Sequence, residues 1–442
     1  IDEAQDMSEE EYQLVHALMT ANEDMRVIAV GDDDQNIYEF RGSDSRFMRQ
    51  LLDESGSSFI EMTENYRSTR HVVDVANAFV KGINHRMKHE PIISLSAEEG
   101  TVKITHCISN IMYQRLVSDL LAQRNNGTMC VLTGTNEEAV ILVALLRKHG
   151  LNSKLIQSMD GFRFWNMAEV RLFMKLILKK VHTPLIPDEI WEEAKRKTFQ
   201  TYSDSASLHY LKRCIQLFEQ TTKAKYWTDF KEFIFESTVE DFCDITDADV
   251  VVSTIHKSKG REFDDVYLLI KKPQHITDLE RRRYYVGMTR AKERLFIYTD
   301  SDIFDRLPAD LHVVDQNHYD LPDQLMLQLS HKDVNLGYFK SIKRDILSLR
   351  AGEQLRFENY FLYPQNSKKA VAQLSQKMQS ELMIWSEKGY SVSCATIRFI
   401  VAWKPKDAPR DEEESAVLLM DLDLKKDTEQ VNMRNTTKAK SQ

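Results

Sequence analysis

The sequence has few cysteines, and their spacing excludes two kinds of scaffold. The five cysteines among 442 residues are odd in number and far apart, and none lies in a CxxC or histidine-rich arrangement. Such spacing fits neither a disulfide framework nor a zinc site. We therefore predict reduced, buried thiols at Cys107, Cys130, Cys214, Cys243 and Cys394.

Long hydrophobic runs are also absent from the sequence. No uncharged apolar stretch is long enough to span a bilayer, and no signal-peptide pattern opens the chain. The composition, with 42% hydrophobic and 29% charged residues, is typical of a soluble globular protein. The sequence predicts a cytoplasmic protein without membrane association, long enough for two or three domains.

The balance of charge is acidic. A net charge of −9 argues against a protein that coats nucleic acid without specificity. It does not exclude a local basic groove, because nucleic-acid binding depends on where lysine and arginine lie.

Predicted strands alternate with predicted helices over the first 300 residues, and there is no internal repeat. The first series lies within residues 1–95, with helices at 9–20, 45–52 and 69–80 and strands at 27–30 and 59–62. The second series lies within residues 96–182 and 246–315. Its strands are predicted at 102–107, 129–132, 154–157, 250–253, 266–270 and 295–298, and its helices at 111–124, 137–149, 167–180 and 279–290. This alternation predicts an α/β protein with parallel sheets flanked by helices.

Two other regions depart from this pattern. Residues 183–245 carry aromatic side chains at helical spacing after two prolines, which predicts a helical insertion. Residues 320–425 predict a small α+β or β-barrel-like accessory domain, and residues 426–442 a disordered tail. Within the accessory domain, 355–362, 392–403 and 417–424 resemble strands, 370–386 a helix and 411–414 a solvated loop.

One loop combines groups that suit two kinds of ligand. The apolar run 27–30 is followed by Gly-Asp-Asp-Asp-Gln-Asn-Ile-Tyr-Glu-Phe-Arg-Gly at 31–42. In open α/β sheets, ligands collect at the carboxyl ends of the strands. Gln35 and Arg41 suit a phosphate, whereas Tyr38 and Phe40 suit a nucleic-acid base. A solvated acidic turn is the alternative interpretation.

Four further segments carry chemistry. Asp2-Glu3 is a carboxylate pair of the kind that holds Mg²⁺ and orients a water in phosphoryl transfer. The other segments are ENYRST at 64–69, TIHKSKGREF at 254–263 and RRRYYVGMTRA at 281–291.

In this order and at these separations, the five segments resemble the motifs of UvrD/Rep-type superfamily 1 DNA helicases. They correspond to the Walker B motif (IDEAQD) and to motifs III, IV, V and VI of that family. The resemblance implies two RecA-like P-loop NTPase domains with ATP between them. Residues 1–95 would be the C-terminal part of the first domain, and residues 96–182 with 246–315 the second.

The resemblance also implies catalytic roles. Asp2 would hold Mg²⁺, and Glu3 would position the hydrolytic water. Gln35 would sense the γ-phosphate. Arg67 and Arg290 would act as arginine fingers that neutralise charge in the transition state.

Binding roles follow from the same resemblance. For the nucleotide, Tyr66 would stack on the adenine, Glu262 and Gly260 would lie near it, and Arg41 would help to tie the first domain to it. For the DNA strand, the resemblance implies base stacking by Phe40 and Tyr38 and backbone contacts by Thr254 and His256. The simpler alternatives are core packing for Tyr284 and Tyr285, ion pairs for Arg281 and Arg282, and a surface charge for Lys257.

The sequence departs from the family in one major respect. No GxxxxGK[ST] loop occurs in the 442 residues, so we expect this chain alone neither to hydrolyse ATP at a useful rate nor to unwind DNA. The opening at Ile1, directly before the acidic pair, suggests a fragment whose upstream half is missing.

The expected function is an ATP-dependent DNA helicase or translocase, 3′ to 5′ by resemblance, acting on single strands and single-strand/duplex junctions in replication, repair or recombination. A protein partner that binds the C-terminal domain is a further hypothesis. One alternative is a non-catalytic remnant that binds DNA or a partner. Another is a helicase–nuclease fusion, suggested by Asp421, Asp423 and Lys425. An alternating strand with exposed charges is the simpler explanation of that DxDxK string.

Overall fold

A computed structural model describes most of the chain. The described residues are 1–22, 24–39, 42–54, 56–109, 111–123, 127–156, 162–180, 183–242, 248–272, 275–339, 342–404, 409 and 413–426. The chain divides into two compact units. The first comprises Ile1–Leu155 and Ala248–Leu321, and the second comprises Ile156–Asp247 and Pro322–Gln442.

A seven-stranded sheet forms the centre of the first unit. Its strand order is β5-β6-β4-β7-β8-β3-β9, and every pair of neighbouring strands is parallel. The strands are β3 (Thr101–Cys107), β4 (Met129–Thr133), β5 (Ser153–Leu155), β6 (Val250–Thr254), β7 (Phe263–Ile270), β8 (Ala291–Thr299) and β9 (Leu311–Asp315). β6 and β4 are buried almost throughout, as expected for strands covered on both faces. The predicted parallel α/β architecture is confirmed.

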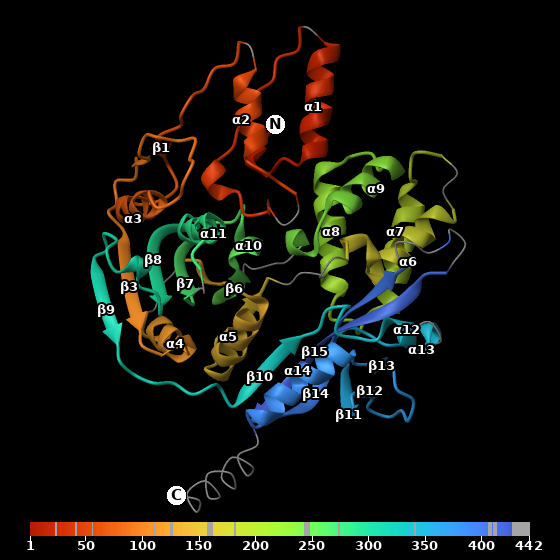
Figure 1. Cartoon of the computed structure of the whole chain (residues 1–442). Helices are drawn as coiled ribbons and strands as arrows, with labels where there is room; N and C mark the ends of the chain where they lie inside the picture. Colours follow the sequence, from red (N-terminus) through yellow and green to blue (C-terminus); the bar gives the residue numbers. More distant parts are fainter. Residues whose placement is uncertain are drawn as a thin grey trace, which may run out of the picture. The chain divides into compact units, whose positions relative to one another are not determined.

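Helices flank this sheet (Figure 1). α4 (Tyr113–Ala122) and α5 (Asn136–Lys148) lie on one side, and α3 (Arg70–Val80), α10 (Ile255–Ser258) and α11 (Asp278–Met288) lie on the other. α5 begins at a capping box in which Thr135 accepts from the Glu138 backbone N–H and Glu138 accepts in return. The short helix η6 spans Asp302–Phe304.

The first 62 residues form helices but not the predicted strands. α1 (Glu9–Ala21) and α2 (Arg46–Asp53) are present, with the short helices η1 (Ala4–Asp6) and η2 (Asp33–Gln35). The strands predicted at 27–30 and 59–62 are wrong: both stretches are irregular, and Ile28 and Ile60 are 77% and 81% exposed. An apolar run becomes a strand only where neighbouring strands complete its hydrogen bonds. Within the described residues, the backbone of 28–30 hydrogen-bonds only to the segment Ile1–Ala4, and the 59–62 run is followed by a two-residue ladder of β1 (Glu64–Asn65) with β2 (Ile93–Ser94).

The second unit combines helices with an antiparallel sheet. Its helices are α6 (Ala168–Leu178), α7 (Asp188–Thr201), α8 (Leu208–Thr221), α9 (Trp227–Glu236), α12 (Leu336–Phe339), α13 (Lys343–Ser348) and α14 (Gln376–Glu387), with η4 (Phe164–Asn166) and η5 (Val239–Phe242). The helices predicted within residues 183–245 are present, and their aromatic side chains pack together with Phe173 of α6. Phe173, Trp191, Phe218 and Phe230 are buried, and their ring centroids lie 4.8–5.8 Å apart.

The antiparallel sheet has the order β10-β15-β14-β11-β12-β13. Its strands are β10 (Gln324–Gln328), β11 (Gln354–Glu358), β12 (Phe361–Pro364), β13 (Ala372–Gln373), β14 (Tyr390–Trp403) and β15 (Ser415–Lys426). The stretch predicted as one strand at 355–362 is a hairpin, because Asn359 and Tyr360 both have positive φ, as a two-residue type I′ turn requires. The helix predicted at 370–386 begins later, at Gln376, because residues 372–373 pair with β12.

α6 lies in the second compact unit, although residues 96–182 were predicted to belong to the domain of the parallel sheet. α6 packs beside α7 and β14, and Arg171 on α6 forms an ion pair with Glu414. The domain boundaries themselves stay predictions.

Four of the five cysteines lie within the described residues, and these four are free thiols. Burial raises the pKa of Cys107 to about 12 and also raises those of Cys130 and Cys214. The prediction of a buried thiol is wrong for Cys394, which is only half-buried on β14 and donates to the half-buried Asp423. Cys243 lies outside the described residues. In the described part of the chain, no helix is both long and apolar enough to cross a membrane.

Candidate functional site

The segment 64–69 is fastened to the start of β8. The Ser68 hydroxyl donates to the carbonyl of Ala291 at 2.7 Å, and the Thr69 backbone N–H donates to the carbonyl of Lys292 at 2.8 Å. Arg67 and Arg290 precede these paired residues on their respective segments. Two arginines that are 223 positions apart in the chain are thereby brought to one place.

Arg290 is buried, with 3% of its surface exposed. Its Nε donates to the carbonyl of Val286 on α11 and one terminal nitrogen to that of Arg261, which fixes the guanidinium plane. Burial lowers the pKa of Arg290 to about 10, and the positive charge of Arg67 adds to this effect. Arg290 therefore remains charged at neutral pH in a position that favours a nearby anion.

The motif III glutamine meets this arginine. Arg290 Nη2 donates to Gln35 Oε1 at 3.0 Å. Arg67 Nε pairs with Glu262 Oε1, and both side chains are more than a third exposed. The structure thus brings together four predicted residues: Gln35, Arg67, Glu262 and Arg290.

The predicted water-positioning residue, Glu3, has a constrained backbone and side chain. Its φ is +50°, in the left-handed region, and its Oε2 accepts from Gln5 Nε2 at 2.6 Å. Lys259 Nζ lies 3.3 Å from the same oxygen and also contacts Asp6. Asp2 is exposed, and its carboxylate accepts from the Glu3 backbone N–H at 2.9 Å.

Gln5 explains the glycine of the loop. This side chain is fully buried, and its Oε1 accepts from the Asp32 backbone N–H at 2.9 Å. A Cβ at position 31 would collide with Gln5 Oε1, so only glycine leaves room for the contact. Gln5 therefore links the Glu3 carboxylate to the acidic loop.

Lys259 also reaches the predicted DNA-binding residues. Its ammonium lies 5.2 Å from the Tyr38 ring centroid and donates to the Gln35 carbonyl at 3.2 Å. The Tyr38 hydroxyl donates to the carbonyl of His256 at 3.1 Å. Lys259 thus contacts residues predicted for hydrolysis and for DNA binding.

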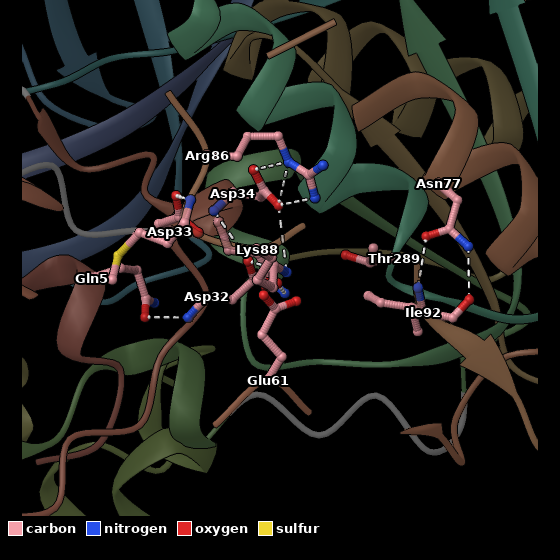
Figure 2. A network of polar contacts seen from close by, with 12 residues as sticks. Gln5, Asp32, Asp33, Asp34, Glu61, Asn77, Arg86, Lys88, Ile92 and Thr289 are labelled. Carbon is pink, nitrogen blue, oxygen red and sulfur yellow. Dashed lines mark hydrogen bonds and ion pairs between the residues drawn. The ribbon is translucent and has the colours of Figure 1, made fainter. Parts of the chain in front are cut away.

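Residues 84–90 clamp the three aspartates of the loop (Figure 2). Arg86 makes a forked contact with Asp34, with Nε–Oδ1 at 2.9 Å and Nη2–Oδ2 at 2.8 Å. Lys88 Nζ lies 2.6 Å from Asp32 Oδ1, and the backbone N–H of Met87 donates to Asp33 Oδ2 at 2.8 Å.

The clamp is itself anchored. The Asn77 side chain on α3 exchanges two hydrogen bonds with the backbone of Ile92, and the Glu61 carboxylate accepts from the backbone N–H groups of His89 and Glu90 (Figure 2). Burial opposes the charge of Lys88, but the carboxylates of Asp32 and Asp34 outweigh it and raise the pKa of Lys88. The carboxylate oxygens of Asp32, Asp33 and Asp34 approach one another closely enough to hold a cation, but Arg86 and Lys88 already supply the compensating charge.

Asp33 differs from its neighbours, which gives a first prediction. Burial raises the pKa of Asp33, and the charge of Asp34 adds to it. Asp33→Asn is therefore expected to raise the free energy of unfolding slightly at pH 7, because the ionised form is penalised in the fold. The gain should shrink as the pH falls to the ordinary aspartate range, where the native side chain is already protonated. Denaturant unfolding at several pH values measures both; a loss of stability at pH 7 contradicts the prediction.

The remaining predicted site residues differ in how far they are exposed to solvent. Tyr66 is 77% exposed, so its ring is open to stacking, and its hydroxyl donates to Glu64, which raises the pKa of Tyr66. Gly260 has φ +80°, a conformation that favours glycine. Thr254 is buried at the end of β6, and His256 is half-buried on α10. Phe40 and Arg41 lie outside the described residues.

The simpler alternatives fare well on motif VI. Tyr284 and Tyr285 are buried on α11. Arg282 pairs with Glu39 at 2.9 Å, an ion pair to the motif III loop as expected. Lys257, in motif V, is half-buried on α10 and donates to Asn136 at 2.8 Å, so it is not simply a solvent-facing charge.

The DxDxK string lies on β15, as the simpler explanation expects, but its charges are not all exposed. Asp421 is buried opposite Arg398, at 3.5 Å, and Asp423 is half-buried, whereas Lys425 is exposed. The expectation of an outward-facing charge row is wrong, because α12 and α13 pack against β15 and its side chains are buried over most of its length.

Sequence reasoning missed the side chains that hold the predicted site residues. Gln5 and Lys259 lie within quoted motifs, so their position was a usable signal. Arg86 and Lys88 lie in none of the motifs, and nothing in their local sequence indicates a role.

Comparison with protein families decides the affiliation. Residues 1–55 match the UvrD/REP helicase N-terminal domain, and residues 60–184 and 185–302 match the UvrD-like helicase C-terminal domain. These matches span more than half of the chain. The chain belongs to the UvrD-like helicase family.

Individual relatives of this UvrD-like chain are distant in sequence. A probable DNA helicase II homolog from Rickettsia conorii is 24% identical over 402 residues, which cover 67% of this chain and 60% of the relative. ATP-dependent DNA helicase PcrA from Staphylococcus epidermidis is 22% identical over 405 residues, covering 67% and 54%. DNA helicase II from Escherichia coli is 26% identical over 187 residues, covering 41% and 25%. The chain thus spans at most about 60% of the length of these relatives.

A solved structure, the C-terminal domain of a possible DNA helicase from Lactobacillus, matches with a TM-score of 0.29 and 13% identity, covering 57% of this chain and 99% of that one. The description of the fold therefore rests on the parallel sheet itself.

Proposed function

We propose that this chain forms the part of an ATP-dependent DNA helicase that senses the nucleotide and grips the DNA strand. The observation that carries the proposal is the contact of Gln35 with Arg290 beside Arg67 and Glu262. A remnant that only binds DNA has no need to keep a buried, charged arginine against an uncharged amide. A polyphosphate has the charge that would compensate Arg290 and Arg67.

The residues present fit part of an ATP·Mg²⁺ site. Arg290, Arg67 and Gln35 would contact the γ-phosphate end, Tyr66 would stack on the adenine and Asp2 would hold the ion. The bound nucleotide would supply the phosphoryl group and the free energy of its hydrolysis. The protein side chains would neutralise charge and, through Glu3, orient a water. The phosphate-cradling P-loop is absent from the 442 residues.

Coupling to DNA follows from the contacts of the motif III loop. Tyr38 lies three residues after Gln35 and contacts His256 and Lys259. A change in the position of Gln35 would therefore also move the residues of this loop that are predicted to contact the DNA strand. If the two nucleotide states grip the strand differently, hydrolysis becomes movement. By resemblance, that movement is 3′ to 5′.

The test compares two forms of the protein. We expect no appreciable ATP hydrolysis or strand separation by the 442-residue chain, and DNA-stimulated hydrolysis with unwinding by a form extended to include a P-loop. Appreciable turnover by the 442 residues alone would overturn the expected inactivity. A folded, extended form that binds ATP but never hydrolyses it in the presence of DNA would overturn the proposed function.

DNA binding can be tested on the 442-residue chain itself. Phe40→Ala is expected to weaken single-strand binding by about 1–3 kcal/mol, the usual contribution of one base–aromatic stack. Fluorescence anisotropy with a labelled oligothymidylate measures it. Phe59→Ala, at an exposed phenylalanine outside the motif III loop, is the control and should leave binding unchanged. Equal affinity of the Phe40 variant and the native chain contradicts the stacking role.

A further inference from the structure

A chain of four side chains leads from the clamp to Arg290. Lys88 Nζ lies 2.6 Å from Asp32 Oδ1, Gln35 Nε2 donates to Asp32 Oδ2 at 2.9 Å, and Arg290 Nη2 donates to Gln35 Oε1 at 3.0 Å. Each contact uses a different atom of its residue, so the four groups form one continuous path. Lys88 also lies over the ring of Tyr285 on α11, 6.0 Å from its centroid.

The two charged neighbours determine which way the Gln35 amide faces. An ionised carboxylate only accepts hydrogen bonds, so the amide nitrogen must face Asp32. A guanidinium only donates, so the amide oxygen must face Arg290. With the amide reversed, both contacts would become unfavourable, since two acceptors and two donors would then meet.

The Asp32 carboxylate needs a partner of its own to hold this orientation. Its Oδ1 accepts from the Asp34 backbone N–H at 3.0 Å and pairs with Lys88, while its Oδ2 faces Gln35. The Asp32 side chain is 23% exposed and that of Lys88 16%, so solvent screens this pair only partly. Without Lys88, the carboxylate keeps a single backbone donor on that oxygen and gains freedom to rotate.

We propose that Lys88 is a positioning residue: acting through Asp32, it fixes the orientation of the Gln35 amide and thereby the contact that this amide makes with Arg290, whose guanidinium the backbone carbonyls of Val286 and Arg261 already hold. The assignment of Gln35 and Arg290 to the nucleotide rests on the proposed function, whereas the chain of contacts does not. Lys88 lies outside all five motif segments and touches neither ATP nor DNA in the proposed roles.

Arg86 provides a matched control within the same clamp. It is also a cation of the 84–90 segment and also binds one of the three aspartates, Asp34. The Asp34 side chain is not on the path from Lys88 through Asp32 to Gln35, although Lys88 Nζ also lies 3.4 Å from Asp34 Oδ2. A variant at Arg86 therefore disturbs the clamp to a similar or greater extent, without removing a member of the path to Gln35.

The test reads the side chains directly by nuclear magnetic resonance of the 442-residue chain, with isotope-labelled glutamine and arginine. The Gln35 amide signal is assigned by its loss in Gln35→Ala. In Lys88→Met, the Gln35 amide and Arg290 Nε–H signals should shift, and their exchange with water should rise several-fold. In Lys88→Arg, which can still donate to Asp32, both signals should return toward their native positions. In Arg86→Met, both should stay in place while the melting temperature falls.

Two results would overturn the proposal: unchanged signals in folded Lys88→Met, or equal shifts in Arg86→Met. If Lys88→Met does not fold, Asp32→Asn is the second variant. An asparagine can donate as well as accept, so the Gln35 signal should again shift. An unchanged signal refutes the proposed path from Lys88 through Asp32 to Gln35. These measurements need no hydrolysis, so a failure of the proposed function would leave them interpretable. In a form that hydrolyses ATP, Lys88→Met should lower kcat more than it alters KM.

Discussion

Arg290→Ala is expected to lower DNA-stimulated ATP hydrolysis by about 10³–10⁵-fold in a form of the protein that includes a P-loop, the range found for arginine fingers. The physical reason is its position: it is buried, held by backbone carbonyls and directed at Gln35, whereas Arg67, the other proposed arginine finger, is more than a third exposed and paired with Glu262. Steady-state hydrolysis with saturating single-stranded DNA measures the loss. Gln35→Ala should produce a smaller loss in the same assay.

The control for this prediction lies on α11, the helix that ends two residues before Arg290. Arg283 on α11 pairs with Glu280 one turn away, so Arg283→Ala removes an arginine without touching Gln35. It should retain most of the turnover. Because Arg290 is buried, each variant must first show a native-like melting curve, and Arg290→Lys tests whether a charge without the forked geometry is sufficient. Turnover of folded Arg290→Ala at the native rate would remove this residue from the site.

Arg86→Met is expected to lower the free energy of unfolding of the first unit by about 3–5 kcal/mol, the usual cost of removing one partner of a buried ion pair. Asp34 is fully buried, and Arg86 supplies its forked partner. The loss therefore comes mainly from a carboxylate left inside the protein without full compensation. Denaturant unfolding followed by intrinsic fluorescence measures it.

Arg49→Met is the matched comparison for stability. Arg49 faces the neighbouring Asp33 at 3.8 Å, but its side chain is 39% exposed. A pair of that kind contributes about 0–1 kcal/mol. The double variant Arg86→Met/Asp34→Asn should recover part of the Arg86→Met loss, since it removes the stranded charge. Equal effects of Arg86→Met and Arg49→Met would show that burial of the Asp34 pair does not matter.

The sequence predicted the second α/β series well because its strands are continuous apolar runs and its helices carry clear apolar faces. The strands observed at 129–133 and 250–254 lie within one residue of those predicted. The same reasoning was wrong at 27–30 and 59–62, where the apolar runs have the composition of strands but lack partner strands. Pairing is a property of the fold, and composition alone does not reveal it.

In the candidate site, too, some residues could be predicted from the sequence and others could not. The motifs named Gln35, Arg67, Glu262 and Arg290, and the structure brings these four together. They did not indicate Lys88 or Arg86, because a supporting ion pair needs only a charge at the right place in space. Nor did they predict the buried Asp421, since whether a charge on an alternating strand faces water depends on what packs against that face of the sheet.

The strand order of the parallel sheet has a consequence for folding during synthesis on the ribosome. β3, β4 and β5 are made first, yet none of them neighbours another in the sheet. β4 and β5 pair with β6, and β3 pairs with β8 and β9, so no hydrogen-bonded pair of this sheet can form before residues 250–254 emerge. Long-range pairing of this kind slows folding and leaves apolar strands uncovered meanwhile. The nascent chain should therefore depend on chaperones until most of the first unit has been synthesised.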